Sequence, residues 1–459
     1  MNLDNAAGDQ AVHSTPATEL PSTAGLRPDF IWGVSTSSFQ IEGATREDGR
    51  GQSIWDVYCQ NGEVKNHDTG DVACDHYHRY REDVALMKRL GVQAYRFSVA
   101  WPRVLPQGQG SANEPGLAFY DRLIDELLAS GIEPWLCLYH WDLPQALEDL
   151  GGWMNRESVA WFARYTMLVS TRFGDRVKRF ATFNEPSIFS LFSRSLGQGG
   201  RSREDNLHRT IHHVNLAHGA AVDVLREKVS GASIGCIHNY QPCWPSSGNE
   251  ADIAAAARLH AYWNLAFPGP QCRGEYPPLV RPAIEPYIRP GDMARICRPV
   301  DWFGLNHYSP VYVKAQPSSI LGFDFGEKPA GALLTPIEWP IDPGAFAETL
   351  LTVHESYGLP IYVMENGFGN FDAPAETGAV IDTERIQFLR AYIEAMNSAA
   401  VKGADVRGYF VWSLLDNFEW QAGYGTRFGL VYVDYPSLRR IPKSSFRWYA
   451  DLINAARRR

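Results

Sequence analysis

Two glutamates stand where a carboxyl group could do chemistry. Glu185 lies between Asn184 and Pro186, and Glu365 precedes Asn366 and a glycine, each after a short apolar run. Two carboxyl groups that face each other can cleave a glycosidic bond: one protonates the leaving oxygen, and the other attacks or stabilises the oxocarbenium-like carbon. Spacing alone leaves open the alternative that both glutamates form ordinary salt bridges or helix caps, since structural ion pairs also perturb carboxyl groups.

Other polar and aromatic side chains follow apolar runs in the same way. They are Gln40, Arg96, His140, Trp141, Asn184, Asn306, Tyr308, Trp412 and Glu419. Amide and carboxyl groups suit sugar hydroxyls, which both donate and accept hydrogen bonds, and tryptophan offers a flat apolar face. A phosphate site would instead need a glycine-rich loop and basic residues. Any one tryptophan, or His140 alone, is more often a core residue, so the predicted polyol pocket depends on their occurring together.

The elements that must position these residues alternate along the chain. Short, nearly continuous apolar runs predict buried parallel strands at 30–34, 94–99, 134–139, 179–183, 233–238, 302–306, 361–364 and 408–413. Apolar residues at helical spacing predict helices at 75–90, 120–129, 159–173, 210–229, 345–356 and 383–401. This alternation predicts an α/β protein with a closed (β/α)8 TIM barrel and long βα-loops in 239–301 and 309–359. The functional residues should then gather at the carboxyl ends of the strands.

Composition limits the classes of partner. The chain has 459 residues, of which 45% are hydrophobic, and its 43 Lys and Arg against 52 Asp and Glu give a net charge of −9. A mildly acidic surface argues against nucleic acid, which requires a concentrated basic footprint. No run approaches 18 consecutive apolar residues, so we expect no membrane span.

The ends of the chain and its cysteines lead to further expectations. Residues 1–25 contain neither the basic nor the apolar segment of a secretory signal, and we expect a disordered extension there. Residues 26–459 would form a single catalytic domain, as a monomer or a homo-oligomer. The seven cysteines are odd in number and include no Cys-x-x-Cys pair, which favours a reducing, cytoplasmic location.

Six motifs carry a resemblance to a known family. They are FQIEG at 39–43, YRFSVAW at 95–101, YHWDLP at 139–144, TFNEP at 182–186, ENG at 365–367 and WSLLDNFEW at 412–420. Occurring in this order, they make the chain resemble glycoside hydrolase family 1, the β-glucosidase family, from about residue 30 to residue 451. Glu185 and Glu365 both belong to these motifs.

The resemblance implies a role for each site residue. Glu185 would be the general acid/base and Glu365 the nucleophile of a retaining mechanism, with Arg96 and Tyr308 keeping Glu365 ionised. The implied substrate-binding residues are Gln40, His140, Trp141, Asn184, Asn306, Tyr308, Trp339, Trp412, Glu419, Trp420 and Phe428. Trp339 would line the aglycone side, with ordinary loop packing as the alternative. No cofactor and no metal are expected, because every chemical role has a protein group.

The expected substrate is a small β-glucoside or oligosaccharide. We expect a β-glucosidase that acts on terminal β-D-glucosyl residues of cello-oligosaccharides and of aryl or alkyl β-glucosides. The alternative is a broad β-glycosidase that acts mainly on β-galactosides or β-fucosides. Phospho-β-glycosidases of the family typically have Ser at the position of Glu419, with Lys and Tyr at those of Thr426 and Phe428, and plant thioglucosidases have Gln at that of Glu185. Neither pattern is present.

Two readings from other classes remain to be weighed. A catalytically dead barrel that only binds sugar is disfavoured because both glutamates are present. A metal hydrolase would use His208 and His212, which have i, i+4 spacing, but no carboxylate lies between them as in His-Glu-x-x-His. The chain also departs from the usual family pattern at Ser187, at His307 and in the loop 197–200, and Ser187 and the loop bear on the aglycone preference.

Overall fold

Eight parallel strands close into a barrel. The computed structural model describes residues 19–192 and 201–458, with side chains from 203 onward in the second range. In spatial order the ring is β1-β11-β10-β7-β5-β4-β3-β2, and every neighbouring pair is parallel. Its strands are β1 (Ile31–Ser35), β2 (Ala94–Ser98), β3 (Glu133–Cys137), β4 (Arg179–Asn184), β5 (Ser233–Asn239), β7 (Trp302–Asn306), β10 (Ile361–Asn366) and β11 (Val406–Trp412). The predicted (β/α)8 barrel is confirmed, with strand limits that shift by one or two residues.

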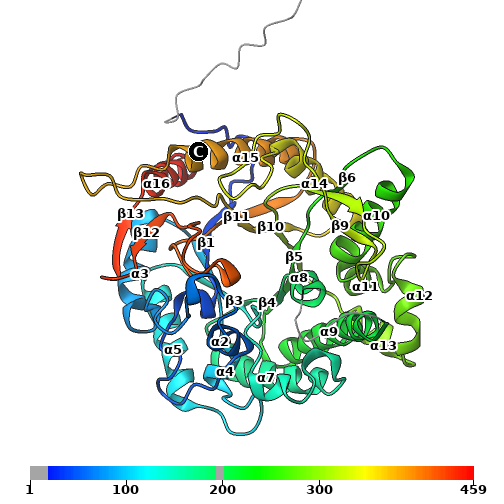
Figure 1. Cartoon of the computed structure of the whole chain (residues 1–459). Coiled ribbons are helices and arrows are strands. Elements are labelled where there is room, and N and C mark those ends of the chain that lie inside the picture. The colour runs from blue at the N-terminus through cyan, green and yellow to red at the C-terminus, as the bar shows by residue number, and fades with distance from the viewer. Residues whose placement is uncertain (1–18, 193–200, 459) are drawn as a thin grey trace, which may run out of the picture.

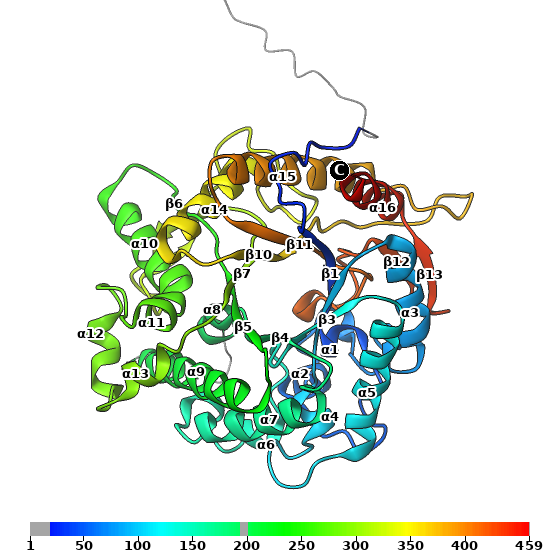
Figure 2. The same ribbon diagram turned by 180° about the vertical axis from the view of Figure 1, so that it is seen from behind.

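Helices surround the ring on the outside (Figure 1). The long ones are α3 (His76–Leu90), α5 (Glu114–Ala129), α7 (Ser158–Phe173), α9 (Arg201–Lys228), α14 (Pro343–Tyr357), α15 (Thr383–Val401) and α16 (Ser444–Arg457). Seen from behind, the same helices enclose the strands (Figure 2). Helix α9 begins at Arg201, before the predicted start at residue 210. The prediction missed this first part of the helix because its polar sequence shows no apolar periodicity. Among the described residues, none of the helices combines the length and the apolar character needed to cross a membrane.

The βα-loops contain further short elements. The helices are α1 (Ser38–Ile41), α2 (Ile54–Gln60), α4 (Trp101–Val104), α6 (Gln145–Glu148), α8 (Pro186–Leu191), α10 (Glu250–His260), α11 (Pro268–Arg273), α12 (Arg281–Ile284) and α13 (Asp292–Ile296). The strands form a three-stranded sheet of β6 (Cys243–Pro245), β8 (Val311–Ala315) and β9 (Phe323–Phe325), and a hairpin of β12 (Val431–Asp434) and β13 (Arg439–Pro442). The two longest predicted loops therefore carry much of this added structure.

Large aromatic side chains fill the barrel interior. The ring of Trp135 lies 5.4 Å from that of Trp302 and 5.3 Å from that of Phe410, between centroids. Two glycines leave space for these rings. A Cβ at Gly33 would lie 2.3 Å from the Phe410 ring, and one at Gly235 would lie 2.4 Å from the Trp302 ring. The barrel is thus a packed core rather than a pore, which leaves the carboxyl ends of the strands for a site.

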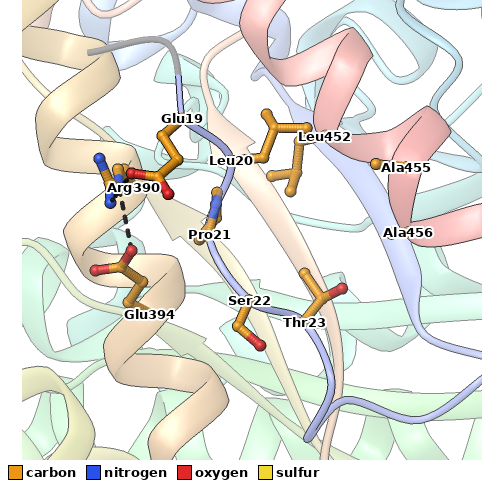
Figure 3. Close-up of a pocket in the computed structure, with 10 residues that line it drawn as sticks. All are labelled: Glu19, Leu20, Pro21, Ser22, Thr23, Arg390, Glu394, Leu452, Ala455 and Ala456. Atoms are coloured by element: carbon orange, nitrogen blue, oxygen red, sulfur yellow. Dashed lines mark hydrogen bonds and ion pairs between the residues drawn. The ribbon is translucent and has the colours of Figure 1, made fainter. Parts of the chain in front are cut away.

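The segment 19–25 packs on the barrel's outer helices. It runs between α15 and α16, beside Leu452 of α16 (Figure 3). Arg390 Nη2 donates to Glu19 Oε2 over 3.3 Å, and the backbone N–H of Gly25 donates to Asn397 Oδ1 over 2.8 Å. Of the extension predicted for residues 1–25, residues 1–18 lie outside the described residues, and residues 19–25 are in contact with the folded body.

Candidate active site

Glu365 is the last but one residue of β10 and receives two strong hydrogen bonds. Arg96, at the centre of β2, donates from Nη1 to Glu365 Oε1 over 2.7 Å, and the Tyr308 hydroxyl donates to Oε2 over 2.7 Å. All three side chains are buried. A positive charge and a hydroxyl donor on one carboxylate favour its ionised form.

Glu185 follows β4 directly and is surrounded by amides instead. Its backbone has a positive φ of 50°, and α8 begins at the next residue. Asn306 Nδ2 donates to Glu185 Oε1 over 2.8 Å, and Asn239 Nδ2 donates to the same oxygen over 2.9 Å. No cation contacts this carboxyl group among the described residues. Glu185 is 4% exposed, so it is buried with neutral partners only.

These two environments separate the proton affinities of the two carboxyl groups. Burial, followed by the charge of Glu365, raises the pKa of Glu185 to about 8. Burial also raises the pKa of Glu365, but the charge of Arg96 and the hydrogen bond from Tyr308 oppose that rise. Glu365 therefore ionises first, and Glu185 keeps its proton at neutral pH. This division suits a nucleophile and a general acid.

A cavity of about 800 Å³ opens above both glutamates. Its lining includes the following residues from the predicted set: His140, Trp141, Glu185, Tyr308, Trp339, Glu365, Trp412, Glu419, Trp420 and Phe428. We call the lining residues His140, Trp412, Glu419, Trp420 and Phe428 the inner part of the cavity; all are buried except Glu419, which is partly exposed. We call the more exposed Phe192, Phe325, Lys328, Glu338 and Trp339 its rim.

Gln40, Asn184 and Asn306 lie behind this lining. Gln40 Nε2 donates to Asn417 Oδ1 and to the carbonyl of Phe418, over 3.0 and 2.9 Å. Asn184 Oδ1 accepts from Asn306 Nδ2 over 3.0 Å, and Arg96 also donates to it. Buried polar groups bonded in this way orient the groups in front of them. These three residues, like Arg96, do not appear in the cavity lining.

Stacked rings form the inner part of the cavity. The imidazole of His140 is nearly parallel to the rings of Trp412 and Trp420, with centroids 5.8 and 5.9 Å away. Burial lowers the pKa of His140 well below its usual value, so the ring is neutral. The indole N–H of Trp141 donates to the carbonyl of Asn184 over 3.0 Å. The result is a rigid wall of flat faces beside Glu365.

Glu419 adds a third carboxyl group to the inner part. The indole N–H of Trp412 donates to Glu419 Oε1 over 3.4 Å. Burial raises the pKa of Glu419 to about 8, and the charge of Glu365 adds to that rise. At neutral pH this group therefore carries a proton and can donate as well as accept, which suits a sugar hydroxyl.

At the rim, Trp339 packs against Tyr308 and Phe428. Its ring centroid lies 5.3 Å from that of Tyr308 and 5.9 Å from that of Phe428, and 39% of Trp339 is exposed. Phe325, of strand β9, is 45% exposed on the same cavity. Such exposed aromatic faces are suited to a ligand that projects out of the cavity.

Asn239 is a site residue that the sequence analysis missed. It ends β5, lines the cavity and donates to Glu185. The predicted strand stopped at residue 238, so the rule that found the other polar residues at strand ends would have found Asn239 one position further on. Trp263 also lines the cavity, but it lies within the long βα-loop 239–301, far from any strand end, so the same rule could not have found it.

The histidines of α9 have protein partners. His208 Nε2 lies 2.8 Å from the Tyr262 hydroxyl, and His212 Nε2 donates to Asp292 Oδ2 over 2.9 Å. Within the described ranges, no group of three or more His, Cys, Asp or Glu is arranged to hold a metal ion. These contacts make the histidines structural.

The residues that depart from the usual family pattern lie at different depths. Ser187 is buried and does not line the cavity. His307 is buried behind Tyr308 and donates from Nδ1 to the carbonyl of Tyr240 over 2.9 Å. The loop 197–200 lies outside the described residues.

Comparisons with known proteins agree with this geometry. A model of glycosyl hydrolase family 1 matches residues 22–458. β-Glucosidase A of Thermotoga maritima is 44% identical over 432 residues, 92% of this chain and 96% of the relative. A bifunctional β-D-glucosidase/β-D-fucosidase of Bifidobacterium breve is 40% identical over 458 residues, 92% of this chain and 97% of the relative. The solved structure of a Thermotoga maritima β-glucosidase in complex with glucoimidazole has a TM-score of 0.88 at 43% identity, covering 94% of this chain and 99% of that one. The chain belongs to glycosyl hydrolase family 1.

Proposed function

We propose that Glu185 is the general acid/base and Glu365 the nucleophile of a retaining β-glucosidase. The enzyme removes terminal, non-reducing β-D-glucosyl residues from cello-oligosaccharides and from aryl or alkyl β-glucosides. The chain is a glycoside hydrolase of the β-glucosidase class, as relatives 44% and 40% identical to it across 92% and 93% of its length are.

One observation supports the roles most directly: the two carboxyl groups have opposite hydrogen-bond environments. Glu365 receives a guanidinium and a phenol, whereas Glu185 receives two amides. The first arrangement favours a carboxylate that can attack. The second, in a buried position beside another carboxylate, favours a carboxylic acid that can protonate a leaving group.

The reaction then proceeds in two steps, formation and hydrolysis of a glycosyl ester. A carboxylate oxygen of Glu365 attacks the anomeric carbon while Glu185 protonates the glycosidic oxygen, so the bond to the aglycone breaks and a glycosyl ester forms. Glu365 is now uncharged, and the pKa of Glu185 falls because the neighbouring charge has gone. A water molecule transfers a proton to Glu185 and attacks the anomeric carbon, so the ester bond to Glu365 breaks, its carboxylate is regenerated and glucose leaves with its configuration retained.

The inner part of the cavity supports a neutral glucosyl unit. It joins the faces of Trp412 and Trp420 with the polar groups of His140 and Glu419. The alternative of a broad glycosidase with mainly galactoside or fucoside activity is not favoured, since curated relatives at 40–44% identity are named β-glucosidases. One relative is named as both a glucosidase and a fucosidase, so we expect fucosides as secondary substrates.

A panel of 4-nitrophenyl glycosides tests this proposal. We expect the highest kcat/KM on the β-glucoside, lower values on the β-fucoside and β-galactoside, and none above background on the α-glucoside. Proton NMR of the first product should show the β-anomer of glucose. An initial α-anomer would reject the retaining mechanism, and a higher kcat/KM on the β-galactoside would reject the substrate assignment.

A further inference from the structure

A π-helical turn stands beside the acid/base. It covers Ala261–Leu265 and continues directly from α10. Single π-turns inside helices are often found at functional sites, because the extra residue re-aims the side chains. Here the turn brings Trp263 to the cavity lining, where its ring packs against Phe192 and Phe325 at centroid distances of 5.7 and 6.2 Å.

Trp263 is linked to Glu185 through one amide. The indole N–H of Trp263 donates to Asn239 Oδ1 over 3.2 Å, and Asn239 Nδ2 donates to Glu185 Oε1 over 2.9 Å. An indole N–H can only donate. Its partner must therefore be the oxygen of the Asn239 amide, and this choice turns the NH₂ group toward the carboxyl group of Glu185.

The next residue of the turn holds the same segment. Asn264 Nδ2 donates to the carbonyl of Gln241 over 2.7 Å, and Asn264 Oδ1 accepts from the backbone N–H of Gln241 over 3.0 Å. Both asparagines are buried. The backbone after β5 is thus anchored by Asn264, which leaves the Trp263 bond free to set the orientation of the Asn239 amide.

We propose that Trp263 is a positioning residue for catalysis, which acts on the acid/base Glu185 by fixing the orientation of Asn239. This inference rests on the proposed function, because it assumes the acid/base role of Glu185. Without the indole N–H, the Asn239 amide is no longer held, and its hydrogen bond to the carboxylate form of Glu185 weakens. Loss of that bond raises the pKa of Glu185, since the bond favours the charged form.

The Trp263→Phe variant tests this, because it keeps an aromatic ring and removes only the donor. In wild type, kcat/KM should fall at alkaline pH as Glu185 loses its proton. In Trp263→Phe we expect this alkaline limb to move to higher pH by about half to one unit, the equivalent of one ordinary hydrogen bond. At pH 6, kcat/KM should fall about three- to tenfold for phenyl β-glucoside and stay unchanged for 2,4-dinitrophenyl β-glucoside, whose leaving group needs no proton.

Trp448→Phe is the matched control. Trp448 is buried on α16, and its indole N–H has no hydrogen-bond partner among the described residues. This variant also replaces a buried indole by a phenyl ring, so it should reproduce any general effect on packing. We expect its pH profile and its dependence on the leaving group to match wild type.

A double-mutant cycle with Asn239→Ala locates the effect. If Trp263 acts only through Asn239, adding Trp263→Phe to Asn239→Ala should move the alkaline limb no further. An additive shift would overturn the proposed route. An unmoved limb in Trp263→Phe, or an equal loss on both substrates, would overturn the positioning role. The assignment of Glu185 fails separately, if Glu185→Gln shows no dependence on the leaving group.

Discussion

The inner part of the cavity and its rim differ in how they are built. The inner residues lie at or after the carboxyl ends of β3 and β11, and His140, Trp412, Trp420 and Phe428 are buried. Most of the rim residues come from the long loop after β7, and of these Phe325 and Trp339 are 45% and 39% exposed. A fixed, desolvated site strengthens every electrostatic interaction in it, whereas an exposed aromatic face contributes mainly contact area. We therefore expect chemistry and sugar recognition to depend on the strand ends, and the aglycone preference to depend on the loops.

The largest effect should come from removing the nucleophile. Glu365→Gly should lower kcat by about 10⁴-fold or more, as loss of an enzyme nucleophile generally does. Azide should restore turnover, because a small anion can occupy the vacated space and attack from the same face. The product to identify by NMR is α-glucosyl azide. A β-configured azide would place the nucleophile elsewhere.

Removing the acid should produce a loss that depends on the aglycone. Glu185→Gln should lower kcat/KM by about 10²–10⁴-fold for phenyl β-glucoside and much less for 2,4-dinitrophenyl β-glucoside. A plot of log kcat/KM against the leaving-group pKa should steepen relative to wild type. Parallel plots for the two enzymes would contradict the acid role.

An inner residue outside the catalytic pair should have an intermediate effect. Glu419→Ser removes a hydrogen-bonding group from the cavity lining and should lower kcat/KM for 4-nitrophenyl β-glucoside about 10- to 100-fold. Activity on the corresponding 6-phosphate, relative to the glucoside, should rise, because the lost hydrogen bond serves a sugar hydroxyl and not a phosphate. If both substrates kept their wild-type values, Glu419 would not contact the sugar.

The pH profile of kcat/KM reports the ionisation of the proposed catalytic pair. Because the pKa of Glu185 is raised to about 8, and the acid must be protonated in the free enzyme, kcat/KM should be lost above about pH 8. The fall should approach tenfold per pH unit. In Glu365→Gln the neighbouring charge is absent, so the pKa of Glu185 measured by NMR titration should be lower than in wild type. An unchanged pKa of Glu185 would show that the charge of Glu365 does not affect it.

The smallest effect should come from the rim. Trp339→Ala should lower kcat/KM for 4-nitrophenyl β-glucoside about three- to tenfold, the contribution of one aromatic contact. The breakdown of the glycosyl ester, followed by stopped flow, should keep its rate because the aglycone has left. Phe371→Ala is the control, since Phe371 is 59% exposed and does not line the cavity. A loss in ester breakdown would show that Trp339 also serves the sugar.

Local patterns were sufficient to predict the barrel. Eight short apolar runs mark the strands, and six of them are followed by a helical pattern. The motifs lie at or near strand ends, so Glu185 and Glu365 could be placed at one end of the barrel. The positions of Arg96 and Tyr308 beside Glu365, implied by the family resemblance, agree with the observed hydrogen bonds.

The sequence by itself determined the fold class and the family, and it predicted Glu185 and Glu365 as the catalytic pair, because these follow from residue type and spacing along the chain. Only the tertiary structure decided which polar residues line the cavity and which, like Gln40, form hydrogen bonds behind that lining. It also brought Trp263 to Asn239, and raised the pKa of Glu419 by burial. Contacts between loops and strands depend on how the barrel closes, and pKa values depend on how far each group is shielded from water. The local order of residues along the chain specifies neither of these.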